Sequence, residues 1–261
     1  MANQNIDQDI DFVAMLEVFE RLAREAGAAI MAHYEFDCRL DDKHDASPLT
    51  AADLAADKII CAGLRAAYPN IALVTEEQSD THQGLKDEKL YFLIDPLDGT
   101  KEFLSRNGQF TVNIALIKNG TPVAGVVFAP ALNRMFLGSK GLGATETDES
   151  GTRAIEVRAM PAEPVAVASR SHRSPETDEF LNAHKITTCV SAGSSLKFCL
   201  VATGEADIYP RFGPTMEWDT AAGQAILEAA GGTVLTPDGH IFRYGKQDHR
   251  NGNFVAQGRP K

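Results

Sequence analysis

Long apolar runs are missing from this sequence of 261 residues, and so are the cysteine patterns of zinc-binding or disulfide-rich proteins. No apolar stretch approaches the roughly 20 residues that a transmembrane helix needs. The four cysteines, Cys38, Cys61, Cys189 and Cys199, form no CxxC pair and have no histidine at zinc-ligand spacing. We therefore expect scattered free thiols rather than two disulfides.

Positive charge is also scarce, because 25 Lys and Arg residues face 36 Asp and Glu residues, a formal net charge of -11. This argues against broad binding to a nucleic acid polymer, which requires a basic surface. A small phosphorylated ligand stays compatible, because a bound divalent cation reverses the local field. The first residues are polar and acidic, unlike a secretory signal. We expect a cytoplasmic protein, and leave peripheral attachment at the inner membrane and the oligomeric state open.

The first part of the chain has the pattern of two helices followed by a sheet. Apolar residues recur every three or four positions over residues 7–34, which predicts an amphipathic helix. Ser47 and Pro48 are typical of a helix start, and the second helix is expected to end near residue 67. Strands follow, with an Asn-Gly hairpin turn at 119–120. The strands are expected at residues 71–75, 91–94, 110–117, 123–128 and 134–138.

The second part alternates between strands and helices, which indicates a further α/β layer. The predicted order is strand 165–168, helix 175–184, strand 187–190, helix 194–202, strand 207–209 and helix 220–230. A polar, glycine-containing stretch at 149–153 marks the expected seam. We therefore predict two packed subdomains, residues 1–150 and 151–261.

Residues 95–100, Asp-Pro-Leu-Asp-Gly-Thr, follow an apolar strand directly. Pro96 and Gly99 favour a tight turn that returns Asp98 towards Asp95, with the carbonyl of Leu97 between them. Two carboxylates and a carbonyl in so small a space repel each other unless a hard cation joins them, and magnesium prefers such oxygen ligands. The alternative is an ordinary turn, since Asp, Pro and Gly are common in turns.

Two further carboxylates bear on whether residues 95–100 form a metal site or an ordinary turn. Glu76 also follows a strand, and adjacent strands place their ends side by side; Glu77 is expected to point to the surface or to support the site. Asp219 precedes a predicted helix, where it could equally serve as a helix cap. Taken alone, each segment leaves both interpretations open.

Together, the segments 95–100 and 218–223 (Trp-Asp-Thr-Ala-Ala-Gly), with Thr-Glu-Glu at 75–77, resemble the signature of the inositol monophosphatase superfamily. The segment 43–53 resembles another motif of these phosphatases and includes Asp53. Lys101-Glu102 and the segments 169–172, 193–199 and 209–215 resemble the bacterial 3'(2'),5'-bisphosphate nucleotidases within it. The likeness covers the chain from about residue 11 to residue 254.

The resemblance implies a layered αβαβα sandwich, of mixed α+β and α/β character, and a magnesium-dependent, lithium-sensitive phosphatase with two or three ions. The implied reaction is hydrolysis of adenosine 3',5'-bisphosphate to AMP and phosphate, which belongs to sulfate assimilation. The implied metal ligands are Glu76, Asp95, the carbonyl of Leu97, Asp98 and Asp219.

Roles for further residues follow from the same resemblance. Glu76 and Thr100 are expected to orient the attacking water, and Asp53 to hold a third ion or accept a proton. The backbone N–H groups of Gly99 and Thr100 are expected to contact the phosphate, along with the ligands Leu97, Asp98 and Asp219. Lys197 and Arg211 are expected to bind the nucleotide, and Arg170 and His172 are further candidates.

Two alternatives remain open at this point. The first is another phosphatase of the superfamily, acting on inositol phosphate, fructose bisphosphate or histidinol phosphate; Lys101-Glu102 and Arg211 weigh against it. The second is a non-catalytic regulatory protein that keeps the fold. The presence of every expected carboxylate weighs against that alternative.

Overall fold

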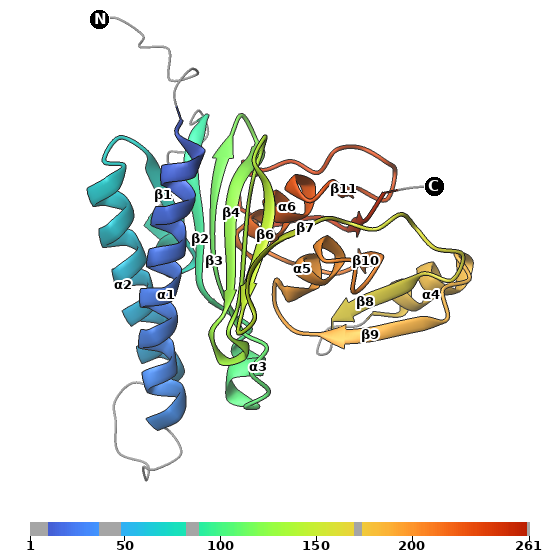
Figure 1. Ribbon diagram of the computed structural model, residues 1–261, viewed down its shortest axis with the longest axis horizontal. Coiled ribbons are helices and arrows are strands. Elements are labelled where there is room, and N and C mark those ends of the chain that lie inside the picture. The colour runs from blue at the N-terminus through green and yellow to red at the C-terminus, as the bar shows by residue number, and fades with distance from the viewer. Residues whose placement is uncertain (1–9, 37–47, 82–88, 170–173, 260–261) are drawn as a thin grey trace, which may run out of the picture.

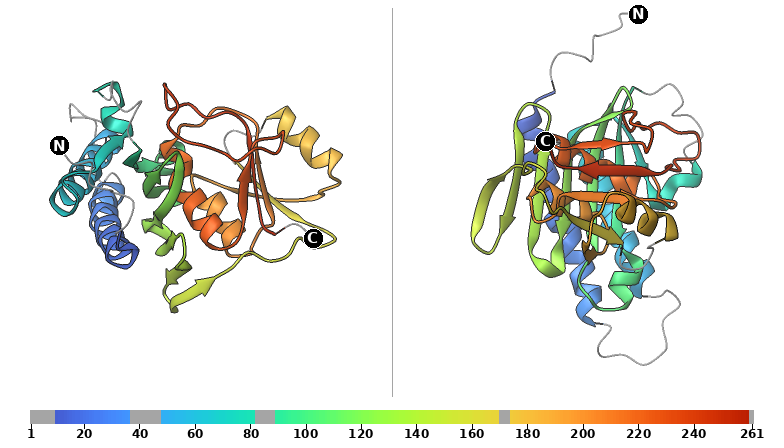
Figure 2. Two further views of the ribbon diagram at one scale, coloured as in Figure 1. Left: turned by 90° about the horizontal axis from the view of Figure 1, so that it is seen from above. Right: turned by 90° about the vertical axis from the view of Figure 1, so that its right-hand side faces the viewer.

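Helices and sheets alternate in five layers across the molecule (Figures 1 and 2). The computed structural model describes residues 10–36, 48–81, 89–169 and 174–259. Helices α1 and α2 cover one face of a seven-stranded sheet, and α5 and α6 pack between its other face and a five-stranded sheet. Helix α4 lies against the outer face of that second sheet. The predicted layered αβαβα sandwich is confirmed.

The first layer consists of α1 (Phe12–Phe36) and α2 (Pro48–Ala67), close to the predicted bounds. Each buries one apolar stripe of residues three or four apart against the first sheet, as the periodicity predicts. Fully buried positions of these stripes are Phe19, Ala23, Ala26 and Ile30 in α1, and Ala52, Ala56, Ile60 and Leu64 in α2. Residues 7–9 of the predicted helix, and the predicted cap Ser47, lie outside the described residues.

The first sheet has its strands in chain order, and β1 pairs parallel to β2 while all later pairs are antiparallel. The predicted hairpin turn is confirmed, because Asn119 and Gly120 both have positive φ, 52° and 71°. The strands are β1 (Ala72–Thr75), β2 (Leu90–Asp98), β3 (Thr111–Lys118), β4 (Thr121–Ala129), β5 (Arg134–Ser139), β6 (Gly143–Asp148) and β7 (Gly151–Ile155). Short 3-10 turns, η1 (Glu76–Thr81) and η3 (Pro130–Leu132), follow β1 and β4.

Strands β6 and β7 were not among the predicted elements. They form a hairpin at the edge of the first sheet, and the seam expected at 149–153 coincides with its turn and the start of β7. The chain therefore leaves this sheet only after Ile155. The division into two subdomains stays a prediction.

The second sheet has the strand order β11-β12-β10-β8-β9. The three predicted strands and three predicted helices of this part are confirmed, and the short strands β11 and β12 are additional. The elements are β8 (Val165–Ser169), α4 (Pro175–Ala183), β9 (Thr188–Ala192), α5 (Leu196–Ala202), β10 (Ile208–Arg211), α6 (Trp218–Ala229), β11 (Thr233–Leu235) and β12 (Phe254–Gln257).

The tight turn predicted after Asp95 is wrong. Strand β2 continues to Asp98, and α3 (Thr100–Leu104) begins two residues later. Asp95 pairs with Asn113 and Asp98 with Thr111, so two residues of β2 stand opposite one residue of β3. This is a β-bulge, and Pro96 suits it because proline cannot donate a ladder hydrogen bond. The extra residue turns Asp95 and Asp98 to the same face, which a regular strand would not do.

Three of the cysteines, Cys61, Cys189 and Cys199, are free thiols, as expected, and Cys38 lies outside the described residues. Among the described helices, none combines the length and the apolarity that crossing a membrane requires.

Candidate active site

A cavity of about 900 Å³ opens where the carboxyl end of β2 faces α5, β10 and the start of α6. Its volume lies within the usual range for small-molecule sites. Nine of the candidate residues line it. These residues are Glu76, Asp95, Leu97, Asp98, Gly99, Thr100, Lys197, Arg211 and Asp219. Asp53 is not on the cavity wall, and Arg170 and His172 lie outside the described residues.

The parallel pairing of β1 with β2 brings the first carboxylates together. Thr75 stands beside Ile94, so Glu76 follows at the level of Asp95. The expected proximity of these two strand ends is confirmed, and their carboxyl groups share a hydrogen bond. Gly99 then takes a left-handed conformation with φ of 100°, in which a Cβ would lie 3.2 Å from the Phe110 Cα. A glycine is therefore required where the chain turns into α3.

The carboxylates of Glu76, Asp95, Asp98 and Asp219 form what we call the cavity floor. Burial and the repulsion between these groups determine their pKa values. Asp95 is 1% exposed, and burial, followed by the charges of Glu76 and Asp98, raises its pKa well above the usual range. Burial also raises the pKa of Asp98, although the nearby Lys197 charge and hydrogen bonds from Ser195 oppose that shift.

The carboxylates that face Asp95 and Asp98 are shifted in the same direction. Burial and the Asp98 charge raise the pKa of Asp219 to about 8, against a hydrogen bond from the Met216 N–H. Glu76 is open to solvent, yet partial burial, with the charges of Asp98 and Glu77, raises its pKa to about 7. The floor therefore carries more negative charge than its protein surroundings stabilise.

Asp53 lies behind this floor, on α2. Burial and the charges of Glu77 and Glu76 raise its pKa to about 8, and a hydrogen bond links it to the Glu77 carboxyl. Its buried Oδ1 has no hydrogen-bond partner. Asp53 thus adjoins the carboxylates of the site without reaching the cavity itself.

Each of three floor carboxylates has one oxygen fixed by a neutral donor. The Leu97 N–H donates to Asp95 Oδ1 at 3.1 Å, the Ser195 hydroxyl to Asp98 Oδ2 at 3.1 Å, and the Met216 N–H to Asp219 Oδ2 at 2.8 Å. Asp95 also shares a hydrogen bond with Glu76, and Asp98 also accepts from the Ser195 backbone N–H. Buried and half-buried carboxylates oriented in this way suit a hard divalent cation, which binds carboxylate oxygen and keeps part of its water shell.

The types of ligand suit a divalent cation, but the described side chains are not arranged as a complete coordination shell. Within the described part of the chain, no three Asp, Glu, His or Cys side chains already stand together as the ligands of a single ion would. The set of metal ligands therefore stays a prediction, as does a ligand role for the carbonyl of Leu97, which lies in the bulge.

Four cationic side chains line the cavity: Lys101, Lys197, Arg211 and Arg250. Lys197 is 5% exposed, its Nζ donates to the Ser194 carbonyl at 2.5 Å, and burial lowers its pKa to about 8. The Arg211 guanidinium donates to the Pro214 carbonyl at 2.9 Å. Among the described residues, none forms a hydrogen bond or ion pair with the Arg250 guanidinium.

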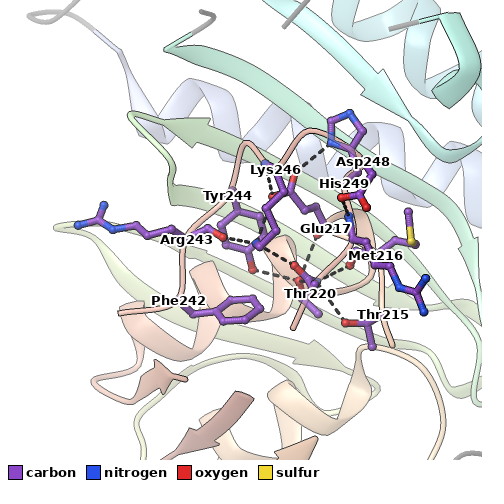
Figure 3. A network of polar contacts seen from close by, with 12 residues as sticks. Thr215, Met216, Glu217, Thr220, Phe242, Arg243, Tyr244, Lys246, Asp248 and His249 are labelled. Atoms are coloured by element: carbon purple, nitrogen blue, oxygen red, sulfur yellow. Dashed lines mark hydrogen bonds and ion pairs between the residues drawn. The ribbon is translucent and has the colours of Figure 1, made fainter. Parts of the chain in front are cut away.

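A polar network fixes the segment that carries Arg250 (Figure 3). The buried Glu217 carboxylate accepts hydrogen bonds from the Lys246 N–H at 3.0 Å and Nζ at 3.3 Å, and contacts His249 Nδ1 at 3.0 Å. Arg250 forms a β-bridge with Met216, three residues before Asp219. Figure 3 shows that the side chain of Arg243, earlier in the same loop, extends away from this network, although its backbone carbonyl accepts a hydrogen bond from Lys246 Nζ.

Sequence reasoning missed several residues of this site. Ser195 and Asn113 contact Asp98, Arg250 is on the wall, and the rings of Tyr209 and Phe212 also line the cavity. Asn113 lies in an apolar strand, so no local pattern marks it. Ser195 and Tyr209 fall within the nucleotidase-like segments, which were the available signal.

Comparison with known proteins agrees with this geometry. The model of the inositol monophosphatase family matches residues 11–261. The chain belongs to the inositol monophosphatase family. The predicted family is thereby confirmed.

Relatives within this family include the 3'(2'),5'-bisphosphate nucleotidase CysQ of Salmonella typhimurium, 49% identical over 234 residues that cover 88% of this chain and 94% of that protein. CysQ of Haemophilus influenzae is 30% identical over 243 residues, covering 91% and 90%. Among solved structures, CysQ of Bacteroides thetaiotaomicron matches with a TM-score of 0.88 and 36% identity, covering 97% of this chain and 100% of that one. An inositol monophosphatase from Anabaena matches with a TM-score of 0.77 and 28% identity, covering 95% and 92%.

Proposed function

We propose that this protein is a magnesium-dependent nucleotidase that hydrolyses adenosine 3',5'-bisphosphate to AMP and phosphate. One observation carries the proposal: a single cavity joins a cluster of carboxylates, with Asp95 buried and Asp98 and Asp219 half-buried, to a wall of cationic and aromatic side chains. A substrate with two phosphates and a base requires both. The printed names of the CysQ relatives support the same reaction.

The floor would hold the metal through Glu76, Asp95, Asp98, Asp219 and the carbonyl of Leu97. Bound magnesium supplies positive charge that spreads the developing charge of the phosphoryl group and favours a nucleophilic water. Two or three ions match the number of carboxylates. The protein's part is to orient these oxygens and exclude bulk water.

Residues at the edge of the cavity would position the attacking water. Glu76, which follows β1 at the level of Asp95 and is open to solvent, would orient this water by a hydrogen bond to its carboxylate. The Thr100 hydroxyl, exposed at the start of α3, would orient that water. Asp53 would accept a proton or hold a third ion. Its unpartnered Oδ1 favours either role.

The opposite wall would bind the rest of the nucleotide. Lys197 and Arg211 would contact the phosphate that is not cleaved, and Arg250 adds a third cation to this group. Tyr209 and Phe212 present rings for the adenine, with Phe212 supported by Phe180 at a centroid distance of 5.5 Å. The backbone of Gly99 and Thr100 would contact the transferred phosphate.

A substrate panel tests this function. We expect kcat/KM with magnesium to be highest for adenosine 3',5'-bisphosphate, lower for adenosine 3'-monophosphate and lowest for inositol 1-phosphate. Equal or better turnover of the inositol ester would instead assign a sugar-phosphate substrate.

Lithium provides a second, independent probe. Family membership favours a metal position that lithium can occupy, so millimolar lithium should inhibit phosphate release. Sodium at the same concentration is the matched control. Unchanged activity in lithium would contradict this part of the proposal. The cytoplasmic location expected from the sequence stays a prediction.

A further inference from the structure

Ser195 occupies the N-cap position of α5 but does not cap that helix. A serine at this position ordinarily accepts a hydrogen bond from a backbone N–H of the first helical turn. Ser174, at the N-cap of α4, does so, since it accepts from the Thr177 N–H at 3.3 Å. The Ser195 hydroxyl instead turns inwards, where the residue is 1% exposed.

The hydroxyl contacts groups from two strands of the first sheet and from α6. It lies 3.1 Å from Asp98 Oδ2, at the end of β2, and 2.6 Å from the backbone carbonyl of Asp219, in the first turn of α6. Asn113, on β3 and fully buried, donates to the Ser195 Oγ at 3.0 Å and reaches Asp98 Oδ2 at 3.5 Å. Ser195 is therefore the point where β2, β3 and α6 are joined.

The neighbouring backbone holds this serine in place. The Gly193 N–H donates to Gln109 Oε1 at 3.0 Å, and a Cβ on Gly193 would lie 2.7 Å from the Gln109 carbonyl. Ser194 takes a positive φ of 44°, which is uncommon for a residue other than glycine. The chain thus accepts an unusual local conformation in order to direct Ser195 into the site.

We propose that Ser195, held by Asn113, is a positioning residue for the metal site. Its single hydroxyl proton is shared between Asp98 Oδ2 at 3.1 Å and the Asp219 carbonyl at 2.6 Å, so that Asp98 and the start of α6 keep one relative position. The Ser195 hydroxyl and the Asn113 amide both lie within 3.5 Å of Asp98 Oδ2, and the Ser195 backbone N–H also donates to this carboxyl. This inference rests on the proposed magnesium dependence, and it assigns no chemical step to Ser195.

Magnesium affinity, measured by calorimetry without substrate, tests the proposal. Ser195→Ala should weaken magnesium binding roughly 10- to 100-fold, the usual effect of losing a group that orients a metal ligand. Ser195→Thr, which keeps the hydroxyl, should recover most of the affinity. Asp11→Ala is the control: Asp11 Oδ1 accepts from the Val13 and Ala14 N–H groups at the start of α1, at 3.0 and 3.1 Å, and Asp11 does not line the cavity. Loss of this helix cap should lower the thermal unfolding midpoint and leave magnesium affinity unchanged.

Coupling between the two positioning side chains provides a further check. If Asn113 acts through Ser195, the double variant Asn113→Ala/Ser195→Ala should lose no more affinity than Ser195→Ala alone. Additive losses would show that Asn113 acts separately, and would overturn the joint role. If Ser195→Ala does not fold, Ser195→Cys replaces it, because the thiol is a weak donor of similar size.

The outcomes separate this inference from the proposed function. Wild-type magnesium affinity in Ser195→Ala overturns the positioning role alone. If the wild-type protein itself binds no magnesium, the metal-dependent function fails, and the positioning role fails with it. A drop in activity at saturating magnesium with unchanged affinity would also count against the proposal.

Discussion

Asp95 and Asp207 have the same exposed fraction, 1%, but their pKa values shift in opposite directions. Burial raises the pKa of both groups. For Asp207, hydrogen bonds from the Arg158 guanidinium, at 2.6 and 2.7 Å, and from the Val165 N–H, at 2.7 Å, outweigh burial and leave the pKa lowered. Asp95 has other carboxylates as neighbours instead.

The opposite pKa shifts indicate different roles: Asp207 is buried in a stabilising ion pair, whereas Asp95 is buried at the proposed binding site. Asp207 ties the chain at Arg158 to the start of β8, and both its oxygens have donors. The cavity carboxylates have one oxygen fixed by a neutral donor and repel each other. Such repulsion does not stabilise the fold, and it favours the proposed cation between these carboxylates.

Asp95→Asn should have the largest effect on activity. Loss of a shared metal ligand should lower phosphate release roughly a thousandfold or more, since each tenfold is about 1.4 kcal/mol of barrier. In EDTA the variant should unfold no more easily than the wild type, because it removes an unstabilised buried charge. Magnesium should raise the thermal unfolding midpoint of the wild type only.

Asp238→Asn, an exposed aspartate outside the cavity, is the control for this pair of measurements. It should match the wild type in both. An Asp95→Asn protein that is inactive and also strongly destabilised in EDTA would break the distinction drawn between Asp95 and Asp207.

Asp207→Asn should show the reverse pattern, with reduced stability and unchanged kcat/KM. Because Arg158 is half exposed, we expect a loss of about 1–3 kcal/mol at pH 7, below the usual cost of breaking a fully buried pair. A lowered folded-state pKa stabilises the protein above the unfolded value, 3.8, and this contribution is lost as pH falls through the folded value. Denaturant unfolding at pH 7 and below pH 4 measures the difference, which should shrink in acid.

Asp148→Asn is the matched control, because Asp148 pairs with Arg153 at a similar distance, 2.6 Å, but on the surface. It should change stability much less than Asp207→Asn does. Equal losses from both variants would show that burial does not account for the role of Asp207.

Two arginines allow a similar comparison between a residue of the site and one outside it. Arg250 lies on the cavity wall, and Arg243 does not. Arg250→Ala should lower kcat/KM for adenosine 3',5'-bisphosphate about tenfold, within the usual worth of a hydrogen bond to a charged group. Turnover of adenosine 3'-monophosphate, which lacks the second phosphate, should not change. Arg243→Ala should affect neither substrate. Equal losses on both substrates would place Arg250 at the transferred phosphate instead.

Patterns that repeat along the chain allowed much of the fold to be predicted. The stripes of α1 and α2 and the Asn-Gly hairpin depend on local spacing, and the sequence shows it directly. Strand β7 could not be found this way, because its residues are largely exposed and carry no apolar alternation. Strands β11 and β12 are three and four residues long, too short for a periodic signal.

The site residues likewise fall into those that local sequence patterns predict and those that they do not. Asp95, Asp98 and Glu76 come from one motif and one neighbouring strand, so the sequence predicts that they meet. The contact between Asn113 and Ser195 joins residues 82 apart, and that of Ser195 with Asp98 joins residues 97 apart. Nothing local encodes such contacts. The sequence predicts a turn at Pro96 in place of the bulge, because proline is favoured in both.

Phosphate release from adenosine 3',5'-bisphosphate, measured in magnesium, then in EDTA, then with magnesium restored, tests the central claim most directly. Activity should disappear in EDTA and return with magnesium, and Asp95→Asn should stay inactive throughout. Activity that survives both EDTA and that substitution would contradict a metal-dependent mechanism at this cavity.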